Sequence, residues 1–132
     1  MKHYEYTNPH PSNDKKLGDC VIRALSIATG KDWLTIYDEL AKIGREQLAP
    51  MTDMKTVHAY IETLNTEKIP VKFEDAKTGK TRRITARVLA TAPNKATYII
   101  RTAGHLATVK DGKLRDTWDS LDRAGYIVWK IV

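Results

Sequence analysis

Apolar residues follow two different periods along this chain. Through the first half they recur every three or four positions, which is the spacing of an amphipathic helix. Each of three such stretches begins at an aspartate or threonine that can accept a hydrogen bond from the first helical turn. The pattern therefore predicts helices over residues 19–29, 32–48 and 53–64, and Gly30 suits the left-handed position that ends the first of them.

In the second half of the chain apolar and polar residues alternate, which is the spacing of β-strands. Asp111-Gly112 is a two-residue hairpin signal. Helices followed by antiparallel strands predict an α+β fold, with the N-terminal helices packed on the sheet. The predicted strands are 69–73, 97–101, 106–110, 114–118 and 126–131, and one short helix is predicted over 85–92. We expect one domain, 1–132, with an extended arm (1–17), a helical part (18–65) and a mainly β part (66–132).

Composition excludes several classes of protein. The single cysteine, Cys20, rules out an internal disulfide bond and a multi-cysteine metal site. No apolar run approaches the roughly 18–20 residues that span a bilayer, and the first residues lack the apolar segment of a secretory signal. We therefore expect a reduced, cytoplasmic protein with no metal, no organic cofactor and no membrane partner.

The net charge of +6 is concentrated in one stretch. Residues 68–87 contain seven lysines and arginines against two acidic residues, and Phe73 is the only aromatic residue among them. One interpretation is a solvated basic loop and edge strand. The other is a contact surface for nucleic acid or another polyanion, with Lys80, Arg82, Arg83 and Arg87 as the candidate contacts.

Cys20 is placed to be reactive. It follows Asp19 directly, in the first turn of a predicted helix, where unpaired backbone N–H groups and the helix dipole favour a thiolate. The same amides can stabilise an oxyanion. The alternative is a small buried core residue. Arg23, one turn later, either supports the thiolate, binds a substrate carboxylate or lies on a solvated helix face; the solvated face is the favoured interpretation.

His105 and Asp116 form a second candidate group. A tight turn at Asp111-Gly112 pairs the flanking strands so that residue 107 lies opposite residue 116. His105 and Asp116 are then diagonal neighbours, roughly 7–8 Å apart between Cα atoms. The imidazole can donate a hydrogen bond to the carboxylate, which fixes its tautomer and orientation. A cysteine at a helix start, followed late in the chain by such a pair, has the order of residues found in papain-like thiol enzymes.

Two segments also resemble a known family. Gly18-Asp-Cys-Val-Ile-Arg-Ala-Leu25 near the start, and Gly104-His105 with Asp116-Thr-Trp-Asp-Ser120 near the end, are similar to motifs of small papain-like proteins of bacteria and their phages. The resemblance implies a papain-like fold with Cys20 as nucleophile, His105 as general base and acid, and Asp116 as the residue that orients His105. Trp118 would shield the His–Asp pair from water, as the tryptophan of Asn-Ser-Trp does in papain-type peptidases.

The chain departs from the family pattern at the oxyanion hole. Papain-type enzymes carry a glutamine shortly before the cysteine, where this chain has Asp14. Asn13, Asn8 and the Cys20 backbone amide are the candidates to take its place. Asp119 is the alternative to Asp116 as the orienting acid if the hairpin pairs in a different register.

These residues predict a cysteine protease-like hydrolase that acts on a peptide or isopeptide amide of a protein substrate through a thioester. An acyltransferase or deamidase is an alternative, because the chemistry as far as the thioester is shared. The rival from a different class is a non-catalytic binding module, phage-encoded, that contacts a host protein or nucleic acid through residues 68–87. The two classes differ in whether function depends on Cys20 or on the basic stretch.

Overall fold

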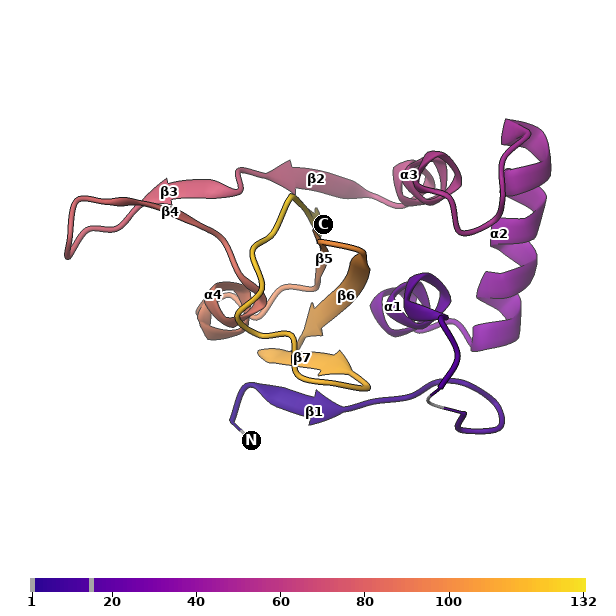
Figure 1. Ribbon diagram of the computed structural model, residues 1–132, viewed down its shortest axis with the longest axis horizontal. Coiled ribbons are helices and arrows are strands. Elements are labelled where there is room, and N and C mark those ends of the chain that lie inside the picture. Colours follow the sequence, from indigo (N-terminus) through magenta and orange to yellow (C-terminus); the bar gives the residue numbers. More distant parts are fainter. Residues whose placement is uncertain (1, 15) are drawn as a thin grey trace.

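The computed structural model describes residues 2–14 and 16–132, which form helices and a mostly antiparallel sheet (Figure 1). The predicted α+β class is confirmed. The helices of the described residues lie where they were predicted, the first three from apolar periodicity and the short fourth from its composition, and none is long and apolar enough to cross a membrane. They are α1 (Cys20–Thr29), α2 (Trp33–Gln47), α3 (Met54–Thr63) and α4 (Ala86–Thr91).

The predicted helix ends are correct in position, but only some of the predicted caps form. Asp32 and Asp53 each accept a hydrogen bond from a backbone N–H in the first turn of α2 and α3. Gly30 ends α1 in the left-handed conformation, with φ of 78°. Asp19 precedes α1 but makes no capping hydrogen bond, because its side chain turns to other partners described below.

The main sheet has the strand order β1-β7-β6-β5-β8-β2. Its neighbouring strands run antiparallel, except that β1 lies parallel to β7. The turn between β6 and β7 has positive φ at both Asp111 and Gly112, as a tight hairpin turn requires. The bounds are β1 (Tyr4–Tyr6), β2 (Thr66–Ile69), β5 (Tyr98–Thr102), β6 (His105–Lys110), β7 (Lys113–Asp116) and β8 (Ile127–Ile131).

Two predictions about strands were wrong. The predicted strand 69–73 is split at Pro70, which has no N–H to give to a ladder: β2 ends at Ile69 and belongs to the main sheet. The next strand, β3 (Lys72–Glu74), pairs instead with β4 (Thr81–Arg83) in a separate hairpin. The N-terminal arm is also not irregular throughout, because β1 pairs with the edge of the sheet.

Apolar side chains fill both faces of the main sheet. Alternation along the strands sends Ile99 and Leu106 to one face, beneath α1, α2 and α3, and sends Ile100 and Ala107 to the other, beneath α4. Figure 1 shows these two groups of helices on opposite sides of the sheet. Thr108 on β6 donates a hydrogen bond of 2.6 Å to the carbonyl of Ala24, which holds α1 against the strands that carry the candidate site.

Candidate active site

The three residues proposed as a triad come from three elements that meet at one end of the sheet. Cys20 is the first residue of α1, His105 the first of β6 and Asp116 the last of β7. Because β6 and β7 are antiparallel neighbours, the start of one lies beside the end of the other. The predicted register is confirmed by the pairs Val109–Leu114 and Thr108–Arg115.

His105 and Asp116 form a short, sheltered hydrogen bond. The distance from His105 Nε2 to Asp116 Oδ2 is 2.6 Å, and the two side chains are only 8% and 2% exposed. Since Nε2 is taken by the carboxylate, Nδ1 is the ring nitrogen left for Cys20. The imidazole is therefore fixed between an acid and a thiol, which is the arrangement of a nucleophile, a base and an orienting group.

The charges of this group favour a thiolate beside an imidazolium. Burial opposes ionisation of Cys20 and by itself raises the pKa of the thiol. The pKa is nevertheless lowered, because His105 and the Leu106 backbone donate hydrogen bonds to the sulfur and because His105 and Arg23 are positively charged. Burial also disfavours a charged imidazole, yet its hydrogen bonds to Asp116 and Cys20 and their charges raise the pKa of His105 to about 9. These opposite shifts are what an ion pair between the two groups produces.

Arg23 is buried, and the favoured prediction of a solvated helix face was wrong. It is 5% exposed because α1 packs directly on β6, so that this side of the helix faces the sheet. Its Nε donates to Asp116 Oδ1 at 3.0 Å, and another guanidinium nitrogen donates to Asp19 Oδ1 at 2.5 Å. Trp33 Nε1 donates to the second oxygen of Asp19 at 2.9 Å. One cation thus joins two buried carboxylates, of which Asp116 belongs to the triad and Asp19 does not.

Trp118 and Asp119 have different surroundings. The Trp118 ring lies 4.7 Å from the His105 ring between centroids and is 39% exposed, so it packs against His105 and is itself partly open to solvent. Asp119 accepts the N–H of Leu121 at 2.9 Å in the turn that follows. With the register as observed, Asp116 is the acid that contacts His105, and the shifted register on which the alternative of Asp119 depended does not occur.

The candidate side chains for an oxyanion hole are not brought to the cysteine. Asn13 is exposed in the N-terminal segment, with φ of 58°, and Asn8 donates its amide to the carbonyl of Asp14 at 3.2 Å. Neither lines the pocket at Cys20. The backbone N–H of Cys20 remains as the available donor, because the first N–H groups of a helix have no acceptor within it.

A pocket of about 300 Å³ opens beside Cys20 and His105. Its other lining residues come from the start of α3, the end of β5 and the turn before β6, and Gly104 in that turn has open space around its α-carbon. The pocket therefore gives a substrate access to the thiol. The further lining residues are Gly18, Val21, Thr52, Met54, Arg101 and Leu106.

Sequence reasoning missed Arg101. It lies on the strand face that also carries Ile99, and it pairs across the strands with Leu106, so a charge occupies a row that is otherwise apolar. That break in the alternation of β5 was visible in the sequence.

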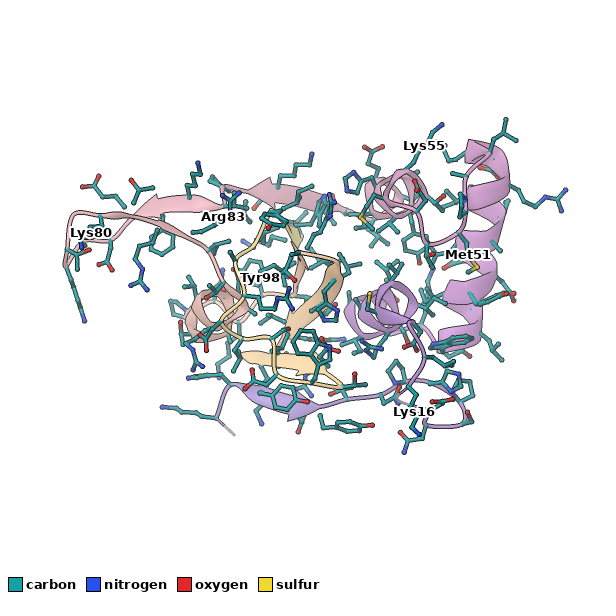
Figure 2. All side chains as sticks on the ribbon, in the orientation of Figure 1. Lys16, Met51, Lys55, Lys80, Arg83 and Tyr98 are labelled. Atoms are coloured by element: carbon teal, nitrogen blue, oxygen red, sulfur yellow. The ribbon has the colours of Figure 1, made fainter. Side chains whose placement is uncertain are left out.

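The basic stretch 68–87 lies outside this site. Its middle forms the β3–β4 hairpin, which projects away from the body of the protein with Lys80 at its far end (Figures 1 and 2). Three of the four candidate contacts already have partners: Arg82 pairs with Asp75, Arg87 with Asp122, and Arg83 donates to the carbonyl of Gly125. Among the described residues, no group of three potential metal ligands is present.

Comparison of the chain with known proteins finds no significantly similar protein. No family model matches the chain, and neither the curated proteins nor the solved structures include one that is significantly similar. The case for a function rests on the geometry of Cys20, His105 and Asp116.

Proposed function

We propose that this protein is a papain-like thiol hydrolase that cleaves a peptide or isopeptide amide. One observation carries the proposal: an imidazole bonded to a buried carboxylate at 2.6 Å interacts with a cysteine at a helix start, beside an open pocket. Structural cysteines are usually buried away from bases and from solvent. Cys20 has both a base and an access route.

In the first half of the proposed reaction, the Cys20 thiolate attacks the carbonyl carbon of the amide. The electron pair of the carbonyl moves to oxygen, and the resulting oxyanion is stabilised by the Cys20 N–H and the start of α1. His105 then gives its Nδ1 proton to the amide nitrogen as the C–N bond breaks. The amine leaves, and the acyl group remains on Cys20 as a thioester.

In the second half, neutral His105 accepts a proton from water as the water oxygen attacks the thioester. The C–S bond breaks, the carboxylic acid leaves, and the thiolate and imidazolium are restored. Asp116 keeps the ring oriented through both halves. If an amine rather than water accepts the acyl group, the same residues perform acyl transfer, and attack on a side-chain amide gives deamidation; analysis of the product distinguishes these outcomes.

Alkylation of Cys20 tests the proposal without a known substrate. Because the pKa of Cys20 is lowered while that of His105 is raised to about 9, the thiolate persists at pH values where a free thiol is protonated. The iodoacetamide rate should therefore change little from pH 6 to 8, whereas an ordinary thiol of pKa about 8.5 reacts nearly tenfold faster for each unit of pH. In His105→Ala the rate should acquire that steep dependence.

The variant must be shown to be folded, by circular dichroism and thermal unfolding, before its rates are compared. His105→Gln serves as a second variant that preserves more of the packing against Trp118. Labelling that is slow at pH 6 in the wild type, or that does not depend on His105, would contradict a thiolate–imidazolium pair and with it the proposed hydrolase.

The projecting β3–β4 hairpin favours a second candidate function, binding of nucleic acid. Lys72, Lys77 and Lys80 have exposed side chains on it, and two-stranded ribbons of this kind can enter a major groove. Phosphate contacts by lysine release counterions, so affinity falls steeply as salt increases.

We expect any such binding to duplex DNA to weaken when the salt concentration is raised from 50 to 200 mM. The double variant Lys77→Gln, Lys80→Gln should bind more weakly still, and the slope of log affinity against log salt concentration should fall in magnitude by about 2. Fluorescence anisotropy measures both. Cys20→Ala should bind as the wild type does. Arg87→Gln is a matched control, because this cation already pairs with Asp122. Binding that is absent at 50 mM salt would remove this candidate.

A further inference from the structure

Arg101 differs from the other arginines of the protein. Six of the eight donate to a carboxylate or to a backbone carbonyl in the described part of the chain. Within that part, the guanidinium groups of Arg45 and Arg101 have neither kind of partner. Arg45 is exposed on α2, where water solvates it, but Arg101 is half-buried and lines the pocket beside Cys20.

The position of Arg101 follows from the strand pairing. Arg101 lies opposite Leu106 on β6 and opposite Ile127 on β8, and both of these belong to the apolar cluster beneath the helices. Arg101 continues the same row near the end of β5, where it lines the pocket. Its stem therefore lies beside apolar neighbours, and a charged side chain is placed at the wall of the cavity.

The charge of Arg101 acts on the neighbouring helix α3. After burial, the charges of Arg101 and Lys68 are the next causes that lower the pKa of His58 there, whereas Glu62 raises it. The imidazolium of His105 lines the same pocket as Arg101, beside the Cys20 thiolate. Arginine is the side chain best suited to bind a carboxylate through two parallel hydrogen bonds.

We propose that Arg101 binds a carboxylate of the substrate, so that the hydrolase acts on peptides with an acidic group close to the bond that is cleaved. The group is either an aspartate or glutamate side chain or a chain-terminal carboxylate; both present the same planar anion. The inference rests on the proposed function, because it assigns the specificity of the same pocket.

Two alkylating reagents separate this inference from the proposed function. Iodoacetate carries a carboxylate and iodoacetamide does not, while in both reactions the Cys20 sulfur attacks the CH₂ carbon, an S–C bond forms and iodide leaves. We expect Arg101→Met to lower the ratio of the iodoacetate rate to the iodoacetamide rate by about tenfold. The iodoacetamide rate itself should stay within about twofold of wild type.

Arg45→Met is the matched control, since it removes the same charge from an exposed site away from the pocket. It should leave the ratio unchanged, and Arg101→Lys should retain part of the preference. An unchanged ratio in a folded Arg101→Met protein overturns the carboxylate site. The ratio can also be measured above pH 9, where an ordinary thiol of pKa about 8.5 is mostly ionised, so the test holds even if Cys20 and His105 prove not to be a catalytic pair.

Protection of Cys20 from iodoacetamide then identifies the source of the carboxylate. The probes are an N-acetylated, C-amidated peptide with one aspartate, the same peptide with asparagine, and a neutral peptide with a free C-terminus. Protection by the aspartyl peptide that is lost in Arg101→Met assigns a side chain, and protection by the free C-terminus assigns a terminal group. Equal protection by the asparagine peptide, or none by either carboxylate peptide, overturns the proposal.

Discussion

Replacing Arg23 by methionine should lower the free energy of unfolding by about 3–5 kcal/mol, because it leaves the buried carboxylate of Asp19 without a cation and takes from buried Asp116 one of its two cations, the other being the imidazolium of His105. Asp19 and Asp116 are 5% and 1% exposed, so water cannot take the place of the guanidinium. Methionine is flexible enough to fill most of the space, which limits the contribution of a cavity. Urea unfolding of the two proteins gives the difference.

The matched control for this loss is Arg87→Met. Arg87 also holds a carboxylate through two hydrogen bonds, with Asp122, but both side chains are exposed and solvent takes over when the pair is broken. We expect no measurable change in its unfolding curve. A double-mutant cycle with Asp116→Asn completes the test: removing the charge of Asp116 as well should recover part of the loss. Equal effects of Arg23→Met and Arg87→Met would show that the buried network does not stabilise the fold.

The sequence predicted the helices well because the residues that determine each helix lie within that helix or next to it. The apolar stripe of α2 and the capping carboxylates of Asp32 and Asp53 act within one or two turns, so no distant residue needs to be known. The same holds for the β6–β7 hairpin, whose register is set by Asp111 and Gly112. Once that register is known, the meeting of His105 and Asp116 follows.

What the sequence did not predict depends on partners far along the chain. The three residues of β1 form a strand only because the edge of β7 is there to receive them. Pro70 marks the point where the chain leaves the main sheet, but nothing near it specifies that β3 pairs with β4 rather than extending β2. A strand's partner is a property of the whole sheet.

The site divides in the same way. Cys20 and the His105–Asp116 pair were found from local positions, whereas the burial of Arg23 depends on α1 lying on β6, more than eighty residues away. An arginine four residues after an aspartate is the spacing of an ion pair on the exposed face of a helix. Only its second carboxylate, Asp116, reveals it as part of the site. For the same reason Arg101 was missed, since the pocket that it lines is built from residues of four elements, α1, α3, β5 and β6.

Asp116→Asn should reduce the alkylation rate of Cys20 at pH 6 by on the order of 100-fold. An amide preserves the shape of the side chain but supplies no negative charge, so the raised pKa of His105 should fall and the lowered pKa of Cys20 should rise. At pH 6 a thiol of pKa about 8.5 is almost entirely protonated, and this sets the size of the loss. Above pH 9 the variant and the wild type should react at similar rates.

Asp119→Asn is the control that makes this result specific. It is the neighbouring aspartate in the same segment, but its carboxylate accepts the N–H of Leu121, and an asparagine oxygen can do the same. Its alkylation profile should match that of the wild type. The direction of the rate change also separates loss of the charge from general loosening of the site. A loosened site would expose Cys20 and speed its alkylation at high pH. Loss of the Asp116 charge instead slows alkylation only at low pH, where the thiolate depends on the imidazolium of His105. If Asp119→Asn shifts the profile and Asp116→Asn does not, the acid that orients His105 has been wrongly assigned.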